Sequence, residues 1–152
     1  MRISFTVHST PPKKYGSGGD LSMWGQASEV PKIIALRRDA FAVMQKEGFT
    51  KCFHSYVKLE FTLFVPTRQL KSIGDLDNFI NGVCNSLQAA DRNALPHIHK
   101  DFHRLEHKNI HPSKPLVIED DKYIISINAK KIDQDEEKPV QEIYYTITVE
   151  VV

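Results

Sequence analysis

A strict alternation of apolar and mostly polar side chains over residues 56–65 constrains the fold more than any other feature of the chain. The apolar members are Val57, Leu59, Phe61, Leu63 and Val65. A period of two places these side chains on one face of a β-strand, and Pro66 then ends the pattern. The chain is therefore expected to build a sheet with one face buried against other elements.

Three further segments alternate in the same way and predict strands, at residues 1–8, 123–132 and 142–152. Apolar spacing of three and four residues predicts one helix from Pro31 to Gly48 and a second over residues 79–87. The composition of residues 10–26 predicts a flexible loop, and acidic residues 133–139 are expected to connect the last two strands. We therefore predict an α+β fold in which two main helices pack on a small mixed sheet.

Length and composition limit the class of protein. The 152 residues, 41% hydrophobic, suit a single domain over residues 1–152. The 20 basic and 19 acidic residues give a net charge of +1, which does not by itself indicate a nucleic-acid partner. No apolar run approaches the roughly 20 residues of a membrane span. We expect a cytoplasmic protein without a membrane partner, whose two cysteines, Cys52 and Cys84, are reduced thiols.

Two acidic motifs are the candidate functional residues. Asp75 and Asp77 are two positions apart in Gly-Asp-Leu-Asp-Asn, so in an extended segment both carboxylates point to the same side. Asp120 and Asp121 follow an apolar stretch at the entry to a predicted strand. Mg²⁺ and Mn²⁺ prefer such oxygen ligands, and a metal site would relieve the repulsion among gathered carboxylates. The alternative is structural, with one motif capping a helix and the other decorating a turn.

The segment DLDNFINGVCNSL followed by VIEDDKYI resembles the RusA family of Holliday junction resolvases. In that family an Asp-x-Asp-Asn motif opens a helix, and an Asp-Asp-Lys/Arg/Gln turn later enters a strand. The resemblance implies that Asp75, Asp77 and Asp121 are catalytic metal ligands for Mg²⁺, with Mn²⁺ as a substitute. The neighbouring Asp120 is a further candidate for the metal, and its role is left open. It also implies a homodimer that binds a four-way DNA junction and cuts it symmetrically.

The chain departs from the family pattern on the predicted second helix. Asn81 occupies the position where the family usually carries a catalytic lysine, and Asn85 stands where an acid is usual. The change removes a cation that could stabilise charge developing on the phosphate. Lys122, Lys71 and Arg68 are near the acidic motifs in sequence and are candidate substitutes. The full set of candidate DNA-binding residues is Lys13, Lys14, Arg68, Lys71, Asn78, Asn81 and Lys122.

A histidine-rich insertion at about residues 90–115 is longer than the corresponding family connection and holds five of the seven histidines. If residues 101–108 are helical, His99, His103 and His107 share one face and can bind zinc. A solvated structural insertion, an oligomerisation element or a DNA contact are the alternatives.

The leading hypothesis is a metal-dependent endonuclease that resolves branched DNA by phosphodiester hydrolysis, in which the metal activates the attacking water. A second hypothesis is a catalytically weak or inactive junction-binding protein of the same fold, and its distinguishing feature is Asn81. A third is a protein unrelated to DNA, whose carboxylates and histidines serve metal storage or assembly.

Overall fold

The computed structural model describes residues 1–15, 22–134 and 142–152 of the chain. Its sheet contains β1 (Arg2–Val7), β2 (Val57–Pro66), β3 (Ile124–Gln134) and β4 (Tyr144–Val151) in the order β1-β4-β2-β3. β4 is antiparallel to both neighbours, whereas β2 and β3 are parallel. The α+β prediction with a small mixed sheet is therefore confirmed.

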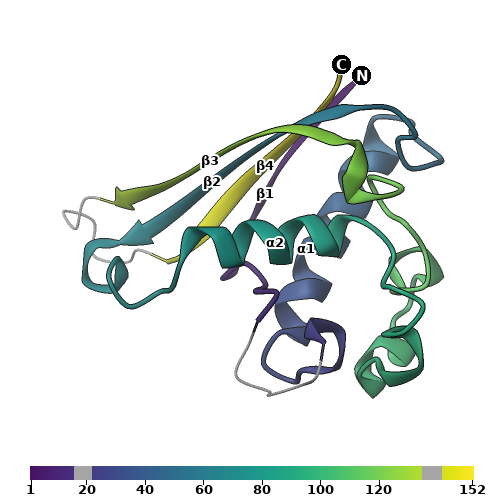
Figure 1. The fold of residues 1–152 in the computed structure, drawn as a ribbon, viewed down its shortest axis with the longest axis horizontal. Helices are drawn as coiled ribbons and strands as arrows, with labels where there is room; N and C mark the ends of the chain where they lie inside the picture. The colour runs from purple at the N-terminus through teal and green to yellow at the C-terminus, as the bar shows by residue number, and fades with distance from the viewer. Residues whose placement is uncertain (16–21, 135–141) are drawn as a thin grey trace.

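Both main helices, α1 (Val30–Lys46) and α2 (Leu76–Leu87), lie against one face of the sheet (Figure 1). The predicted alternation in β2 decides which face this is, because its five apolar residues are all at most 1% exposed. They form one core with apolar residues of both helices, and Phe61 packs on Tyr145 from β4. Within the described residues, the structure contains no helix with the length and apolar character needed to cross a membrane.

The parallel pairing of β2 and β3 gives α2 its orientation. The chain leaves β2 at Pro66, passes through a short 3₁₀ turn and runs back along the sheet as α2. It returns to the beginning of β3, where Ile124 is paired with Val57. The two ends of α2 therefore lie near opposite ends of the β2–β3 pair.

The predicted flexible loop after β1 is packed where the structure describes it. Pro11, Pro12, Met23 and Trp24 are all buried, and residues 23–25 form a 3₁₀ turn. Residues 16–21 of that loop lie outside the described part, and so do residues 135–139 of the predicted acidic connection, within the undescribed range 135–141.

The histidine-rich insertion is not a continuous helix. It contains separate 3₁₀ turns at Leu95–His97, Lys100–Arg104 and Lys108–Ile110. The condition for placing His99, His103 and His107 on one helical face is therefore not met. The insertion buries Phe102 against Trp24, with ring centroids 5.9 Å apart, in a second small core at the start of α1.

Arg37 of α1 joins the insertion to the rest of the fold. The residue is fully buried, which is unusual for an arginine. The guanidinium donates to the carbonyl oxygens of Ser86 and Gln88 at the end of α2, and to three in the insertion: Ile110, His111 and Lys114. These five bonds use all five N–H donors of arginine. They also satisfy α2 carbonyls that have no partner within the helix.

Candidate functional site

The first acidic motif lies at the N-terminal end of α2. Asp75 occupies the N-cap position with an extended backbone, φ −81° and ψ 137°, and within the described chain its side chain makes no capping hydrogen bond. Asp77 lies in the first helical turn, and both residues are exposed. The positive end of the helix dipole favours carboxylates here. In the described chain, the Asp75 side chain therefore does not have the helix-capping role that was the structural alternative.

Two lysines approach the turn that precedes Asp75. Lys131 of β3 donates from Nζ to the carbonyl oxygen of Gly74 at 2.8 Å. The Nζ of Lys13 lies 5.1 Å from the ring centroid of Phe79, and a Cβ added to Gly74 would be 2.8 Å from that Nζ. Gly74 has φ +121°, which a side chain would strain. Lysine charge is thus present at this end of α2 even though Asn81 is neutral.

Lys131 was missed by the sequence analysis. Its position in the chain, ten residues after Asp121, gives no indication of proximity to Asp75. The signal is in the parallel register, which pairs Lys131 with Leu63 close to the end of β2. Only the pairing of the two strands makes this lysine a neighbour of the turn before α2.

A short arm, residues 11–15, crosses α2 near this site. The side-chain amide of Asn78 accepts from the backbone N–H of Tyr15 and donates to the Tyr15 carbonyl, both at 3.0 Å. One turn further along, a Cβ on Gly82 would meet the carbonyl oxygen of Pro12 at 2.1 Å. Asn78 therefore positions the arm that carries Lys13 and Lys14, in addition to its expected role at the DNA.

The arm is also attached to α1. The backbone N–H of Lys13 donates to Oε1 of Glu29 at 2.8 Å, and Glu29 is only 2% exposed. Ser28 and Lys32 donate to its other oxygen. The position of Lys13 beside the first acidic motif therefore depends on contacts with both helices.

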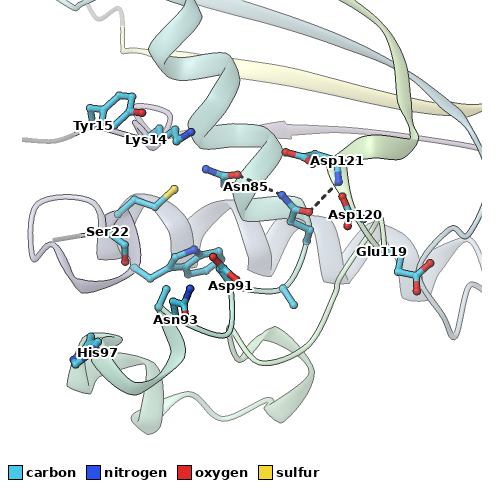
Figure 2. A pocket seen from close by; sticks show the side chains of 15 residues that line it. Lys14, Tyr15, Ser22, Asn85, Asp91, Asn93, His97, Glu119, Asp120 and Asp121 are labelled. Carbon is cyan, nitrogen blue, oxygen red and sulfur yellow. Dashed lines mark hydrogen bonds between the residues drawn. The ribbon is translucent and has the colours of Figure 1, made fainter. Parts of the chain in front are cut away.

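The second acidic motif lies at the opposite end of α2. The backbone N–H of Asp121 donates to Oε1 of Gln88 at 2.9 Å, and Gln88 donates to Asn85 at 3.3 Å (Figure 2). The carboxylate of Asp120 accepts from the backbone N–H of Lys122 at 3.0 Å. This hydrogen bond is the largest cause that lowers the pKa of Asp120. Asp120 is consequently anionic at neutral pH.

Asp120 and Asp121 line an open cleft of about 920 Å³. Figure 2 shows Asn85 and Asp121 on one side of it, and Asp91, Asn93 and His97 from the insertion on another. The insertion therefore forms one wall of the cleft at the second acidic motif. None of the lining residues belongs to the first motif, Asp75 and Asp77.

The structure does not bring the three predicted metal ligands together in one chain. Asp75 precedes α2 and Asp77 is in its first turn, whereas Asp121 contacts Gln88 just after the last residue of α2. A helix of 12 residues is about 18 Å long at the usual helical rise. Among residues 1–15, 22–134 and 142–152, no three His, Cys, Asp or Glu side chains form a group able to hold a metal ion. A single Mg²⁺ bound by all three aspartates does not fit one chain.

The other predicted DNA contacts lie before α2, on α2 and beside the second acidic motif. Arg68, Lys71 and Asn81 are exposed near the N-terminal half of α2. Lys122 is exposed beside the second motif, where its Nζ lies 5.4 Å from the Tyr123 ring centroid.

The chain was compared with models of known protein families and with curated proteins. It matches none of them.

Proposed function

We propose that the protein is a metal-dependent endonuclease acting on branched DNA. The observation that carries the proposal is the pair of acidic motifs at the two ends of α2. Asp75 is not used as a helix cap, and Asp77 and Asp121 are exposed. Lys13 and Lys131 add positive charge beside the first motif. This combination suits a phosphodiester substrate, since lysines bind backbone phosphates and carboxylates bind the divalent ions used for phosphodiester hydrolysis.

The separation of the acidic motifs supports a homodimer as the active form. If the α2 helices of two chains run antiparallel, the N-terminal end of each lies beside the C-terminal end of the other. Asp75 and Asp77 of one chain would then approach Asp121 of its partner, and the dimer would carry two such sites. Two sites related by twofold symmetry suit a four-way junction, which presents two equivalent strands for cutting.

The experiment is cleavage of a labelled four-way junction, beside linear duplex, with Mg²⁺ or Mn²⁺. Wild type is expected to make paired symmetric nicks that disappear in Asp77→Asn and Asp121→Asn. Glu60→Gln, an exposed carboxylate on the sheet face that carries no helix, is the matched control and should cut normally. The proposal is refuted if the wild-type protein shows no binding and no cutting of the junction.

Mixing the two inactive variants tests whether the site is shared. In a heterodimer of Asp77→Asn with Asp121→Asn, a shared arrangement leaves one of two sites intact, so single nicks should reappear. A site built within one chain leaves both sites damaged, and the mixture should stay inactive. That second outcome would reject the shared site while leaving the endonuclease proposal standing.

An inactive junction-binding protein is the second candidate, and one observation favours it. Asn81 is exposed on the face of α2 where the resembling family carries its lysine, so a neutral amide stands where a cation is expected. Tight binding of the junction without nicks in either metal would select this candidate.

A further inference from the structure

Cys52 and His54, which precede β2, form a continuous line of contacts with Glu119, which precedes the second acidic motif. The Sγ of Cys52 lies 3.8 Å from Nε2 of His54, and Nδ1 of His54 lies 2.9 Å from Oε2 of Glu119. The backbone holds them in place, because Phe53 donates to Val117 at 2.7 Å and Glu119 donates back to Phe53 at 3.2 Å. Thiol, imidazole and carboxylate are thereby positioned by a short bridge between two segments.

The two contacts of His54 use opposite nitrogens of the ring. An ionised carboxylate only accepts hydrogen bonds, so Nδ1 of His54 donates to Glu119 and carries the proton of the neutral ring. The lone pair of Nε2 then faces Cys52, which donates its S–H. The ligands of a metal ion converge on one point. These three groups instead lie in a row, with His54 between the thiol and the carboxylate. The order of nucleophile, base and orienting acid is that of an activated nucleophile.

The thiol is protonated at rest. Burial, followed by the negative charge of Glu119, raises the pKa of Cys52. Reaction therefore requires transfer of the S–H proton to His54 at the time of attack. Glu119 orients the ring and stabilises the imidazolium that forms, the role that a carboxylate has beside a catalytic histidine. Here both side chains are exposed, His54 at 57% and Glu119 at 46%.

A cleft of about 360 Å³ opens beside the thiol and indicates which reagent it suits. Cys52 and His54 line it together with Lys51 and Lys114, the two cations of the lining. Its remaining walls are largely apolar, with Phe41, Met44, Phe49, Pro115 and Leu116. A small molecule with an apolar body and negative charge fits this lining.

We propose that Cys52 is a reactive thiol that exchanges with small anionic disulfides and is converted to a mixed disulfide. The thiol proton passes to Nε2 of His54 as Sγ attacks one sulfur of the disulfide. The new S–S bond forms while the old one breaks, and the departing thiolate takes the proton from His54. The Cys52 sulfur is oxidised and the leaving sulfur is reduced, so no further oxidant is needed. The exchange uses none of the residues proposed for the endonuclease activity, although Glu119 directly precedes Asp120 and lines the same cleft.

The test measures thiol-exchange rates on the whole folded protein with two probes, the dianion dithiobis(nitrobenzoate) and neutral dithiodipyridine. The other cysteine, Cys84, is 6% exposed, and burial raises its pKa to about 12, so it serves as an internal reference. Wild type is expected to react rapidly at one thiol, and Cys52→Ser should abolish that phase. His54→Gln should slow both probes by about ten-fold or more, a modest share of the usual effect of a general base.

Two comparisons separate a relay from simple exposure of the thiol. Glu119→Gln should slow exchange less than His54→Gln does, because it removes orientation while leaving the base. Lys51→Gln and Lys114→Gln should slow the dianionic probe selectively and leave the neutral probe unchanged. Exchange in His54→Gln at the wild-type rate, or faster reaction of Cys84 than of Cys52, would overturn the proposal. Circular dichroism of each variant confirms that the fold is retained.

Discussion

Replacing Arg37 by methionine removes the five-donor connection between α1, the end of α2 and the insertion. The substitution keeps an unbranched apolar stem of similar length and deletes the charge. Five carbonyl oxygens lose a charged donor at 2.6–3.0 Å. Each of these carbonyl oxygens that water does not reach then has the desolvation cost of an unsatisfied acceptor, about 1–3 kcal/mol.

Relief of the buried charge offsets part of this loss. Burial lowers the pKa of Arg37 to about 9, which shows that the interior disfavours the cation even though the guanidinium stays charged at neutral pH. We expect a net loss of about 3–5 kcal/mol, comparable with removal of one partner from a buried ion pair. For a chain of this size, that loss lowers Tm by roughly 6–20 °C.

Urea denaturation monitored by circular dichroism measures the change, and Arg38→Met is the matched control because the neighbouring side chain is exposed. The control is expected to stay within about 0.5 kcal/mol of wild type. Arg37→Lys should lose nearly as much as Arg37→Met, since an ammonium has three donors and no planar fork. A loss below about 1 kcal/mol in Arg37→Met would refute the reasoning that these bonds stabilise the fold.

Three further predictions follow from single contacts. Gly82→Ala places a Cβ against the Pro12 carbonyl, so it should lower the free energy of unfolding by about 1–3 kcal/mol. It should also speed tryptic cleavage after Lys13, and unchanged proteolysis would contradict the close approach. Burial, then the charge of nearby His103, Arg37 and Lys114, lowers the pKa of His111. Its stabilisation should be complete above about pH 6.5 and be lost as pH falls through the lowered folded value, and His111→Gln should reduce the difference in urea midpoint between pH 7.5 and 5.0. Asn81→Lys should raise the junction-cleavage rate if the proposed endonuclease activity is correct, with Asn81→Gln as the neutral control; equal rates would show that Asn81 does not limit activity.

The regular elements could be predicted from sequence because their signals are local. The alternation in residues 56–65 and the helical spacing after Pro31 reflect which side chains face the core, and the structure confirms them as β2 and α1. The insertion could not be predicted in the same way. Its 3₁₀ turns are held by contacts with distant residues, such as the hydrogen bond from the His99 N–H to the Trp24 carbonyl.

For the candidate site too, local features could be predicted from sequence and contacts between distant segments could not. The pairing of Asp75 with Asp77 is a property of two neighbouring positions and was accessible to sequence reasoning. Their distance from Asp121 depends on the direction of α2 along the sheet, which spacing does not reveal. The burial of Arg37 could not be predicted in this way either. Helical periodicity identifies which residues share a face, but the insertion that covers this arginine folds against it from far along the chain.

The strand order has a consequence for synthesis on the ribosome. In the described sheet, β1 pairs with β4, so that Ile3 is opposite Val149. Residues 8–143 have to be synthesised between β1 and β4, so β1 waits roughly 7–30 s for its partner at usual elongation rates. β4 also joins β1 to β2, so a nascent chain that lacks it has two separate edges with unpaired backbone groups. Exposed strand edges favour association with other chains, and β1 is the segment for which a nascent-chain chaperone would matter most.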